Sequence, residues 1–290
     1  MYKDRNGNIH NNDATPTGMI SFMYNTLPGR LLLKLTTRPW VSNVVRGYMR
    51  SSVSGLHIYP FIKKNSVDLS EYESATYHCF NDFFIRKIRA AYRPVVEDPG
   101  LLAAPCDSHV SVFRIEDGLV LDIKSSHYTV ASLLRNDELA REFRDGWCIV
   151  MRLTVDNYHR YSYPDNGVKT GDVFVPGVLH TVSPVALEKL QVFVENQRVY
   201  TVIDTENFGK MVQMEVGAVC VGRIVNHHGP GPVRRGEEKG YFEFGGSTVV
   251  LLLDGKHFTP DTDLIENTED GFETIIKMGE RIGYNEKYQG

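Results

Sequence analysis

With 290 residues, of which 42% are hydrophobic and 23% charged, the chain has enough apolar material for a folded core of one or two domains, and this composition excludes a disordered protein. The formal net charge of −4 argues against a nucleic-acid-binding protein, because nothing in the sequence resembles a basic groove lined with stacking aromatic residues.

The cysteines and the N-terminus indicate where the protein is made and kept. Cys79, Cys106, Cys148 and Cys220 form no C-x-x-C pair and have no histidine at metal spacing, so we predict neither a metal site nor a disulfide framework. The polar N-terminus has no signal-peptide pattern, and no uncharged apolar run approaches the roughly 18 to 20 residues that span a bilayer. We therefore expect an intracellular protein in a reducing compartment.

The first part of the chain is basic and amphipathic. Residues up to about Asn12 indicate a loose arm or a hairpin. Residues 14–67 contain no Asp or Glu but seven Lys and Arg residues, with apolar residues at spacings of three and four. This pattern predicts two or three short amphipathic helices, broken at Pro28 and Pro39. Such a region suits either an anionic membrane surface, where each basic residue contributes about 1 kcal/mol, or a helical layer packed on the body.

Residues 79–94 predict a helix that ends at a proline. One face is apolar and the other basic, with Phe80, Phe84 and Ile88 on the first, and Arg86, Arg89 and Arg93 on the second. Arginines placed in this way form either the polar edge of a core helix or a site for phosphates or carboxylates.

From about residue 99 the sequence changes to short predicted strands separated by glycines. A strand over 101–110 contains an acidic turn at Asp107, which either caps the turn or, if it is buried, needs a partner. A helix is predicted over 130–143 and a strand over 147–155. His159 follows that strand beside aromatic residues, as a general base can, although a lone histidine is more often structural.

Strands with β-branched residues between glycines are predicted over 171–182 and 217–224, as in small barrels or sandwiches, and further strands are predicted over 191–203 and 211–216. His227 and His228 lie in the next loop and, without carboxylate or cysteine partners nearby, do not indicate a metal site. The whole pattern predicts an α+β fold. We expect N-terminal amphipathic helices over 1–98 and a β-rich body of small barrel-like or sandwich-like sheets over 99–290.

Residues 241–250 place a Gly-Gly-Ser step between two predicted strands. Gly245 and Gly246 leave room beside the Gly246 carbonyl, as an attack by the hydroxyl of Ser247 would require. Considered alone, the tripeptide is more simply a glycine bulge or a turn followed by an ordinary strand serine.

Four stretches taken together resemble the phosphatidylserine decarboxylase family of pyruvoyl-dependent enzymes. They are Phe83-Phe84-Ile85-Arg86 with Arg93-Pro94, Pro105-Cys106-Asp107, Asp156-Asn157-Tyr158-His159-Arg160, and Lys239-Gly240-Tyr241-Phe242 running into Gly245-Gly246-Ser247-Thr248. The resemblance covers roughly residues 80–253 and is specific, because no single motif carries it.

The resemblance implies a self-processing proenzyme. Ser247 would attack the Gly246 carbonyl, dividing the precursor into a β chain, 1–246, and an α chain, 247–290, whose first residue becomes the pyruvoyl cofactor. Asp107 and His159 would assist Ser247, since a serine hydroxyl is a poor nucleophile and general-base help gives roughly 10²- to 10⁴-fold.

The resemblance also implies the second reaction. The pyruvoyl group would accept the electrons released as CO₂ departs. His159 is the candidate proton donor, and the candidate pocket walls are Tyr158, Phe242 and Phe244, which could equally be core. Bacterial members often carry a second histidine where this chain has Ser162, so His159 is the candidate for both steps.

The expected function is conversion of a phospholipid substrate, phosphatidylserine, to phosphatidylethanolamine and CO₂. We expect a peripheral protein on an anionic membrane surface at the cytoplasmic face. Whether it forms a homo-oligomer is left open. One alternative is a pyruvoyl-dependent decarboxylase of a soluble amino acid. The other, from a different class, is a non-catalytic binding module resembling lipoyl or biotinyl carrier barrels.

Overall fold

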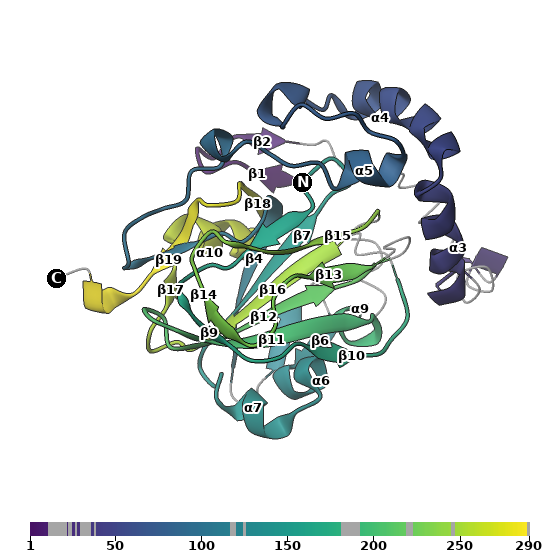
Figure 1. The fold of residues 1–290 in the computed structure, drawn as a ribbon. Coiled ribbons are helices and arrows are strands. Elements are labelled where there is room, and N and C mark those ends of the chain that lie inside the picture. Colours follow the sequence, from purple (N-terminus) through teal and green to yellow (C-terminus); the bar gives the residue numbers. More distant parts are fainter. Residues whose placement is uncertain are drawn as a thin grey trace.

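The computed structural model describes residues 1–10, 22, 25–26, 28–29, 36–37, 39–116, 120–123, 126–180, 192–218, 223–244 and 247–288. In these residues, strands form a central body, and short helices lie along its outside (Figure 1). The α+β fold class is therefore confirmed, with β-sheets as the dominant part of the body.

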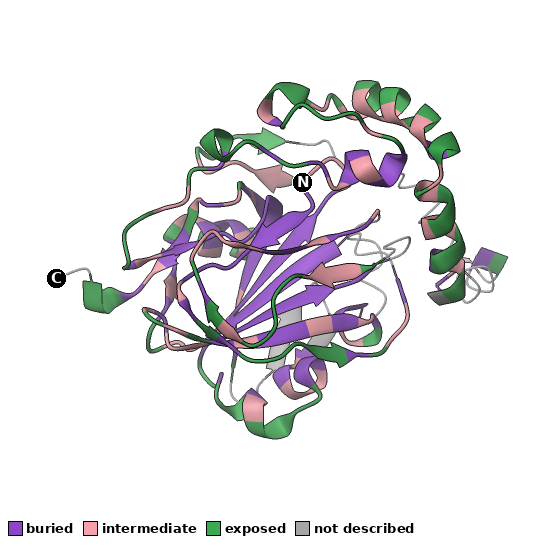
Figure 2. Ribbon diagram, in the orientation of Figure 1, coloured by how far each residue is buried: buried purple, intermediate pink, exposed green. Residues whose placement is uncertain are grey.

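The largest sheet has 11 strands, and every neighbouring pair in it is antiparallel except β1 and β18. In spatial order its strands are β14 (Gly231–Val233), β9 (Gly167–Lys169), β11 (Arg198–Thr205), β12 (Lys210–Val216), β16 (Ser247–Leu253), β7 (Trp147–Leu153), β4 (Ser108–Arg114), β18 (Glu273–Ile276), β1 (Tyr2–Lys3) and β2 (Ile9–His10), with β10 (Val173–Val175) paired to β11. All seven residues of β16 are buried, which makes this strand the centre of the core (Figure 2).

The part of the chain that the structure describes contains three smaller sheets beside the large one. The first contains β13 (Ile224–Asn226), β15 (Glu238–Phe242) and β8 (Arg160–Ser162); the second β17 (Thr259–Pro260), β19 (Arg281–Tyr284) and β3 (Leu101–Ala103); the third β5 (Val120–Ile123) and β6 (Ser126–Thr129). Strands β13 and β15 approach closely at Gly240, where an added Cβ would lie 1.9 Å from the Val225 carbonyl oxygen. Only glycine fits at this position.

The helices are short and lie outside the sheets. Those in the described residues are α3 (Pro39–Met49), α4 (Ile58–Asn65), α5 (Phe80–Phe84), α6 (Val130–Leu134), α7 (Asp137–Arg141), α9 (Val192–Glu195) and α10 (Thr262–Glu269), with 3₁₀ turns η1 (Ser52–His57), η2 (Leu69–Glu71), η3 (Ala90–Tyr92) and η4 (Glu286–Tyr288). Helices α3, α4 and α5 lie along one side of the molecule, and α6 and α7 lie at its far end (Figure 1). Across the described residues, none of the helices combines the length and apolar character needed to cross a bilayer.

The predicted helix over 79–94 is wrong beyond Phe84, where α5 ends. The chain there turns back and pairs with an earlier segment, as Glu73 N donates to Lys87 O and Arg89 N donates to Glu71 O. These long-range backbone bonds override the helical periodicity. The predicted helix over 130–143 is likewise two helices, α6 and α7, because Arg135 adopts a left-handed conformation with φ of 50°.

Two further predictions concern the ends of elements. Residues 192–195, predicted as the start of a strand, are helical (α9), and the strand begins at Arg198. The expected arm or hairpin at the N-terminus is a hairpin, β1 and β2, attached to β18 of the large sheet. The division at residue 98/99 stays a prediction. Residues 219–222 of the expected strand over 217–224 lie outside the described residues.

Candidate active site

Two chain crossings between sheets bring the candidate catalytic residues together. One crossing leads from β7 in the large sheet to β8, in the small sheet of β13, β15 and β8, and carries His159. The other leads from β15 in the small sheet to β16 in the large sheet and ends at Ser247. Because β7 pairs with β16, and β8 pairs with β15, the two crossings must run side by side.

Ser247 is the first residue of β16 and is fully buried. It stands opposite Leu153 of β7, and its Oγ has no hydrogen-bond partner among the described residues. Gly245 and Gly246 lie outside the described residues, and with them the carbonyl side of the predicted cleavage bond. A buried hydroxyl without a partner is uncommon, because it loses its hydrogen bonds to water without replacement.

His159 is also fully buried, and one of its two ring nitrogens is free. Its Nδ1 donates to the backbone carbonyl of Asn157 at 2.9 Å, since a carbonyl oxygen can only accept. The other nitrogen, Nε2, therefore keeps a lone pair, and it has no partner among the described residues. Burial, with the positive charge of Arg86, lowers the pKa of His159 to about 3. The side chain is thus a neutral base at physiological pH.

The surroundings of His159 fix its ring. The Asn157 Oδ1 accepts from Thr154 N at 2.8 Å and closes the turn after β7. The His159 carbonyl accepts from Phe242 N at 3.0 Å, which joins the histidine to the strand that leads to Ser247. The imidazole lies against the ring of Phe84, with 4.0 Å between the ring centroids. The backbone on both sides and an aromatic wall thus orient the base.

Asp107 lies at the same end of the large sheet, immediately before β4. The register aligns His109, Arg152 and Thr248 across β4, β7 and β16. Asp107 and Ser247 precede the first and last of these residues, so their backbones are separated by two strand spacings, roughly 10 Å. Its carboxylate accepts from Arg93 Nε at 2.8 Å and Nη2 at 2.6 Å, and from Met278 N at 2.8 Å. Asp107 therefore bonds to Arg93, and no bond joins it to His159 among the described residues.

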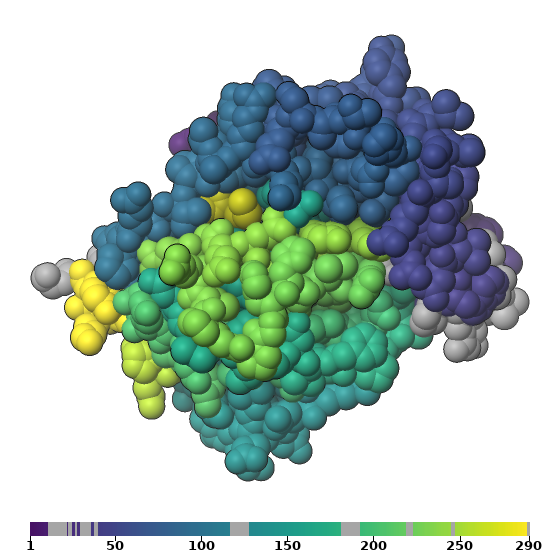
Figure 3. Space-filling model, viewed as in Figure 1, coloured from purple at the N-terminus to yellow at the C-terminus, as the bar shows by residue number. Residues whose placement is uncertain are grey.

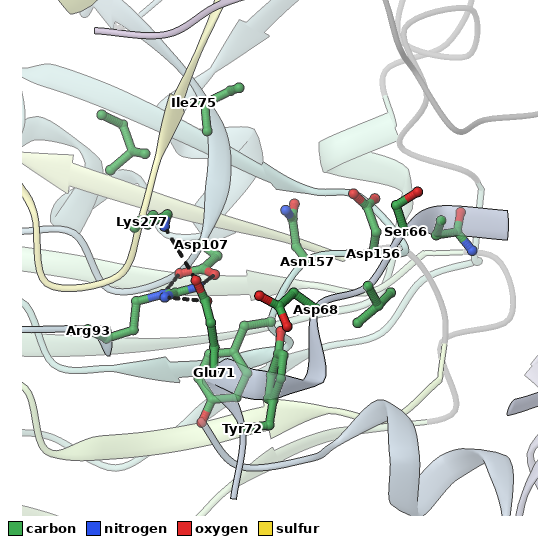
Figure 4. Close-up of a pocket in the computed structure, with 14 residues that line it drawn as sticks. Ser66, Asp68, Glu71, Tyr72, Arg93, Asp107, Asp156, Asn157, Ile275 and Lys277 are labelled. Atoms are coloured by element: carbon green, nitrogen blue, oxygen red, sulfur yellow. Dashed lines mark hydrogen bonds and ion pairs between the residues drawn. The ribbon is translucent and has the colours of Figure 1, made fainter. Parts of the chain in front are cut away.

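A polar cavity of about 270 Å³ opens beside these residues (Figure 4). Asp107, Tyr158 and Asn157 line it, so it adjoins the segment that carries His159. Its charged lining residues are Asp68, Glu71, Asp107 and Asp156, with Arg93 and Lys277. Arg93 donates to both Asp107 and Glu71, so its charge is already neutralised. The cavity therefore has an excess of negative charge and favours a positively charged group such as an amine.

The three candidate pocket walls differ in position. Tyr158 lines the cavity. Phe242 is fully buried in the main core, with its ring 4.9 Å from that of Tyr161. Phe244 packs on Phe80 and Phe84 and does not border this cavity. Their roles toward a substrate stay predictions.

Comparison with known proteins decides the family. The family model described as Phosphatidylserine decarboxylase matches residues 80–284. Phosphatidylserine decarboxylase proenzyme 2 of Clostridium acetobutylicum is 43% identical over 267 residues, which are 92% of this chain and 91% of that protein. This chain belongs to the phosphatidylserine decarboxylase family. The resemblance stated from the sequence is therefore confirmed, and the protein is a decarboxylase of this pyruvoyl-dependent family.

Other similar proteins agree over nearly the whole length. The phosphatidylserine decarboxylase proenzyme of Clostridium botulinum strain 657 is 35% identical over 97% of this chain and 98% of its own. That of Clostridium tetani is 34% identical over 91% of each chain. The similarity thus extends beyond the matched motifs into the N-terminal region.

Ser162, at the position where the resemblance implies a second histidine in bacterial members, is buried. Its backbone N and its Oγ both point to the Pro105 carbonyl, at 2.8 and 3.3 Å. Position 162 therefore contacts the segment that carries Asp107, whereas His159 contacts the aromatic cluster of α5. In this chain the described residues offer one histidine, His159, at the crossing of the two sheets.

Sequence reasoning missed the partners of the candidate residues. Arg86 and Arg93 were expected either on the polar edge of a core helix or in a site for phosphates or carboxylates. Both are buried; Arg86 lies beside His159, and Arg93 donates to the carboxylate of Asp107, as the second alternative expected. Their place in the family motif was the signal that could have identified them. His227 and His228 do have carboxylate neighbours, Glu238 at 2.8 Å and Glu237 at 3.6 Å, which corrects the sequence expectation. No cluster of three or more metal-ligating side chains occurs in the part that the structure describes.

Proposed function

We propose that this chain is a self-processing phosphatidylserine decarboxylase, which makes its own pyruvoyl group from Ser247 and converts phosphatidylserine to phosphatidylethanolamine and CO₂. The observation that carries the proposal is the placement of two fully buried reactive atoms, Ser247 Oγ and His159 Nε2, at adjacent crossings between the same two sheets, where neither has a hydrogen-bond partner among the described residues. Family membership supplies the reaction class.

Self-cleavage would begin with proton transfer. The neutral Nε2 of His159 accepts the proton of Ser247 Oγ, and Oγ attacks the carbonyl carbon of Gly246. The carbon–nitrogen bond between the two residues breaks, the nitrogen takes up a proton, and an ester joins Gly246 to Ser247. Loss of the α proton of Ser247 expels the Gly246 carboxylate. Water then replaces the nitrogen, which leaves as ammonia, and residue 247 becomes a pyruvoyl group.

The environment of residue 247 fits such a group. A pyruvoyl group is uncharged and no larger than serine, so it can occupy the same fully buried position. The serine Oγ makes no hydrogen bond to the described part of the chain that the conversion would break. Once formed, the pyruvoyl group supplies the electron sink for decarboxylation.

The chain's own residues would bind and protonate the substrate. Carboxylates around the cavity, among them Asp68 and Asp156, attract the amine of the serine head group. His159 is the group placed to return a proton to the substrate carbon after CO₂ leaves. Its low pKa makes it a strong acid once it is protonated, which favours that transfer. The candidate role of Tyr158 is to form one wall of this cavity.

The exposed surface supports a lipid substrate over a soluble amino acid. The cavity of about 270 Å³ is suited to a head group, so acyl chains must lie outside it. Large apolar side chains are exposed on the acid-free helical segment along one side of the molecule (Figures 2 and 3). Among them are Trp40, Val44, Tyr48, Val53, Leu56 and Tyr59. With Lys63 and Lys64 in the last turn of α4, this surface suits peripheral contact with an anionic membrane.

The first test is the protein itself on a denaturing gel, with intact mass spectrometry. The proposal predicts two chains, residues 1–246 and 247–290. A single uncut chain would exclude both pyruvoyl functions and favour a non-catalytic module. Purified enzyme is then given phosphatidylserine in vesicles, or soluble amino acids, and CO₂ is measured. Release from soluble amino acids alone would favour the alternative substrate. Co-sedimentation with anionic vesicles tests membrane contact, and light scattering tests whether it forms a homo-oligomer.

A further inference from the structure

Glu243 is a buried carboxylate in the segment that leads to the cleavage serine. It directly follows β15 and is 1% exposed. Its Oε1 accepts from Arg50 Nη2, and Arg50 is its ion-pair partner among the described residues. Its second oxygen, Oε2, is buried and has no partner among the described residues. The carboxylate is therefore only half satisfied.

Such an arrangement is unfavourable for stability alone. Moving a carboxylate out of water is costly unless charge pairing and hydrogen bonds replace the lost solvation. Arg50 is about half exposed, and it meets only one of the two oxygens. A glutamine or an apolar residue would avoid most of this cost. Conflicts of this kind between local stability and the chosen residue concentrate at functional sites.

The next residue, Phe244, is anchored on another element. Its backbone N donates to Asn81 Oδ1 at 3.2 Å, and its ring packs on Phe80 and Phe84, with centroids 5.2 and 5.3 Å away. Phe84 in turn lies against His159. Thus Phe244 is joined to α5 and to the aromatic wall behind the candidate base, while Glu243 is joined to Arg50, which follows α3.

We propose that Arg50 and Glu243 form a positioning pair for self-cleavage, which fixes the chain on the N-terminal side of the Gly246–Ser247 bond relative to His159. The pair rests on the proposed function, because it matters only if this bond is cut. Arg50 lies 193 positions before Glu243, so the contact ties the outer helical region to the cleavage segment. Loss of such a tie should slow the reaction, since a misplacement of about 1 Å costs on the order of 10²-fold.

The pair should affect cleavage more than turnover. After cleavage, Glu243 belongs to the β chain, and the pyruvoyl group begins the α chain. The described cavity contains neither Arg50 nor Glu243. Turnover per pyruvoyl group should therefore be independent of the pair, which distinguishes a positioning role in processing from a general structural role.

The test follows cleavage of the full-length chain after cell-free synthesis, as the rate at which residues 247–290 are released on a denaturing gel. Glu243→Gln keeps the shape of the side chain and removes its charge. Arg50→Gln removes the partner, and Arg50→Lys can still donate one N–H to Oε1. The matched control is Glu237→Gln, just before β15, whose carboxylate accepts from Arg234 N and faces His228.

We expect Glu243→Gln and Arg50→Gln each to slow release about 10- to 100-fold. Arg50→Lys and Glu237→Gln should cleave close to the wild-type rate, and the Arg50→Gln, Glu243→Gln double variant should be no slower than the slower single variant. The melting temperature of Glu243→Gln should be equal to or above that of the wild type, because the variant no longer buries a charge. Its CO₂ release per pyruvoyl group should match that of the wild type.

Two results would overturn the pair. One is wild-type cleavage in Glu243→Gln; the other is a parallel fall in cleavage, turnover per pyruvoyl group and melting temperature, which means a general structural role. Failure of the wild-type chain to cleave at all would refute the proposed function instead. The two failures are therefore distinguishable.

Discussion

Lowering the pH of freshly synthesised proenzyme from 8 to 5 should leave its self-cleavage rate nearly unchanged, because His159 stays neutral over this range. Burial, with the charge of Arg86, lowers the pKa of His159 to about 3. At pH 5 about 99% of this imidazole is then the free base. An ordinary histidine, with a pKa of about 6.5, would be only about 3% free base at pH 5, a difference of about 30-fold in the available base.

The assay is a pulse of cell-free synthesis followed by dilution into buffers from pH 5 to 9, with the release of residues 247–290 measured over time. A flat profile is expected. A rate that falls with a midpoint near pH 6.5 would show that the base is not held neutral by burial, and would refute the argument.

The same pKa shift predicts how stability depends on pH. Below pH 6.5 the unfolded chain protonates His159, while the folded chain does not do so until about pH 3. The contribution of this residue to stability is fully present above pH 6.5 and is lost as the pH falls toward 3. The loss is about 1.4 kcal/mol per pH unit, or about 2 kcal/mol between pH 6.5 and 5.

Denaturant unfolding measures this loss on an uncut Ser247→Ala background. Introducing His159→Gln there should remove about 2 kcal/mol of the difference between pH 6.5 and 5. An unchanged pH dependence would mean that His159 is solvated.

Three further predictions concern other residues. Ser247→Ala should give one chain with the mass of the full precursor, and any release of residues 247–290 would contradict the assigned nucleophile. Asp107→Asn weakens the bidentate pair with Arg93, so it should lower the free energy of unfolding by roughly 1 to 3 kcal/mol and slow cleavage. Urea denaturation measures the first effect and the gel assay the second. An unchanged free energy of unfolding and an unchanged cleavage rate would contradict the pairing. Leu56→Asp should reduce co-sedimentation with anionic vesicles. Phe174→Asp, an equally polar change at another exposed site, should not. An equal loss of co-sedimentation in both variants would contradict membrane contact through the helical segment.

The β-rich body could be predicted because its signal is local. The strands β7, β12 and β16 were predicted from the residues within them, by a mostly apolar run over 147–155, a short strand over 211–216, and apolar alternation with a β-branched run over 241–250. The helix over 79–94 failed for the opposite reason. Its apolar spacing is helical, but the backbone of residues 87–89 bonds to residues 71–73, and no local pattern reports that pairing.

The residues of the candidate site could be proposed from the sequence, whereas the contacts that these residues make could not. Ser247, His159 and Asp107 follow from the motif set, and the fold brings all three to one end of the large sheet. The bond from Asp107 to Arg93 depends on how the turns before β4 pack. The contact of Glu243 with Arg50 joins residues 193 positions apart. Such pairs depend on the tertiary fold, so the sequence identifies the residues but does not show which of them bond to one another.

Intact mass spectrometry of the purified wild-type protein tests the central claim most directly. The account predicts two masses, one for residues 1–246 and one for residues 247–290, with the second lower by one ammonia than a chain that begins with serine. A single mass for all 290 residues, or a second chain that begins with unmodified Ser247, would contradict it.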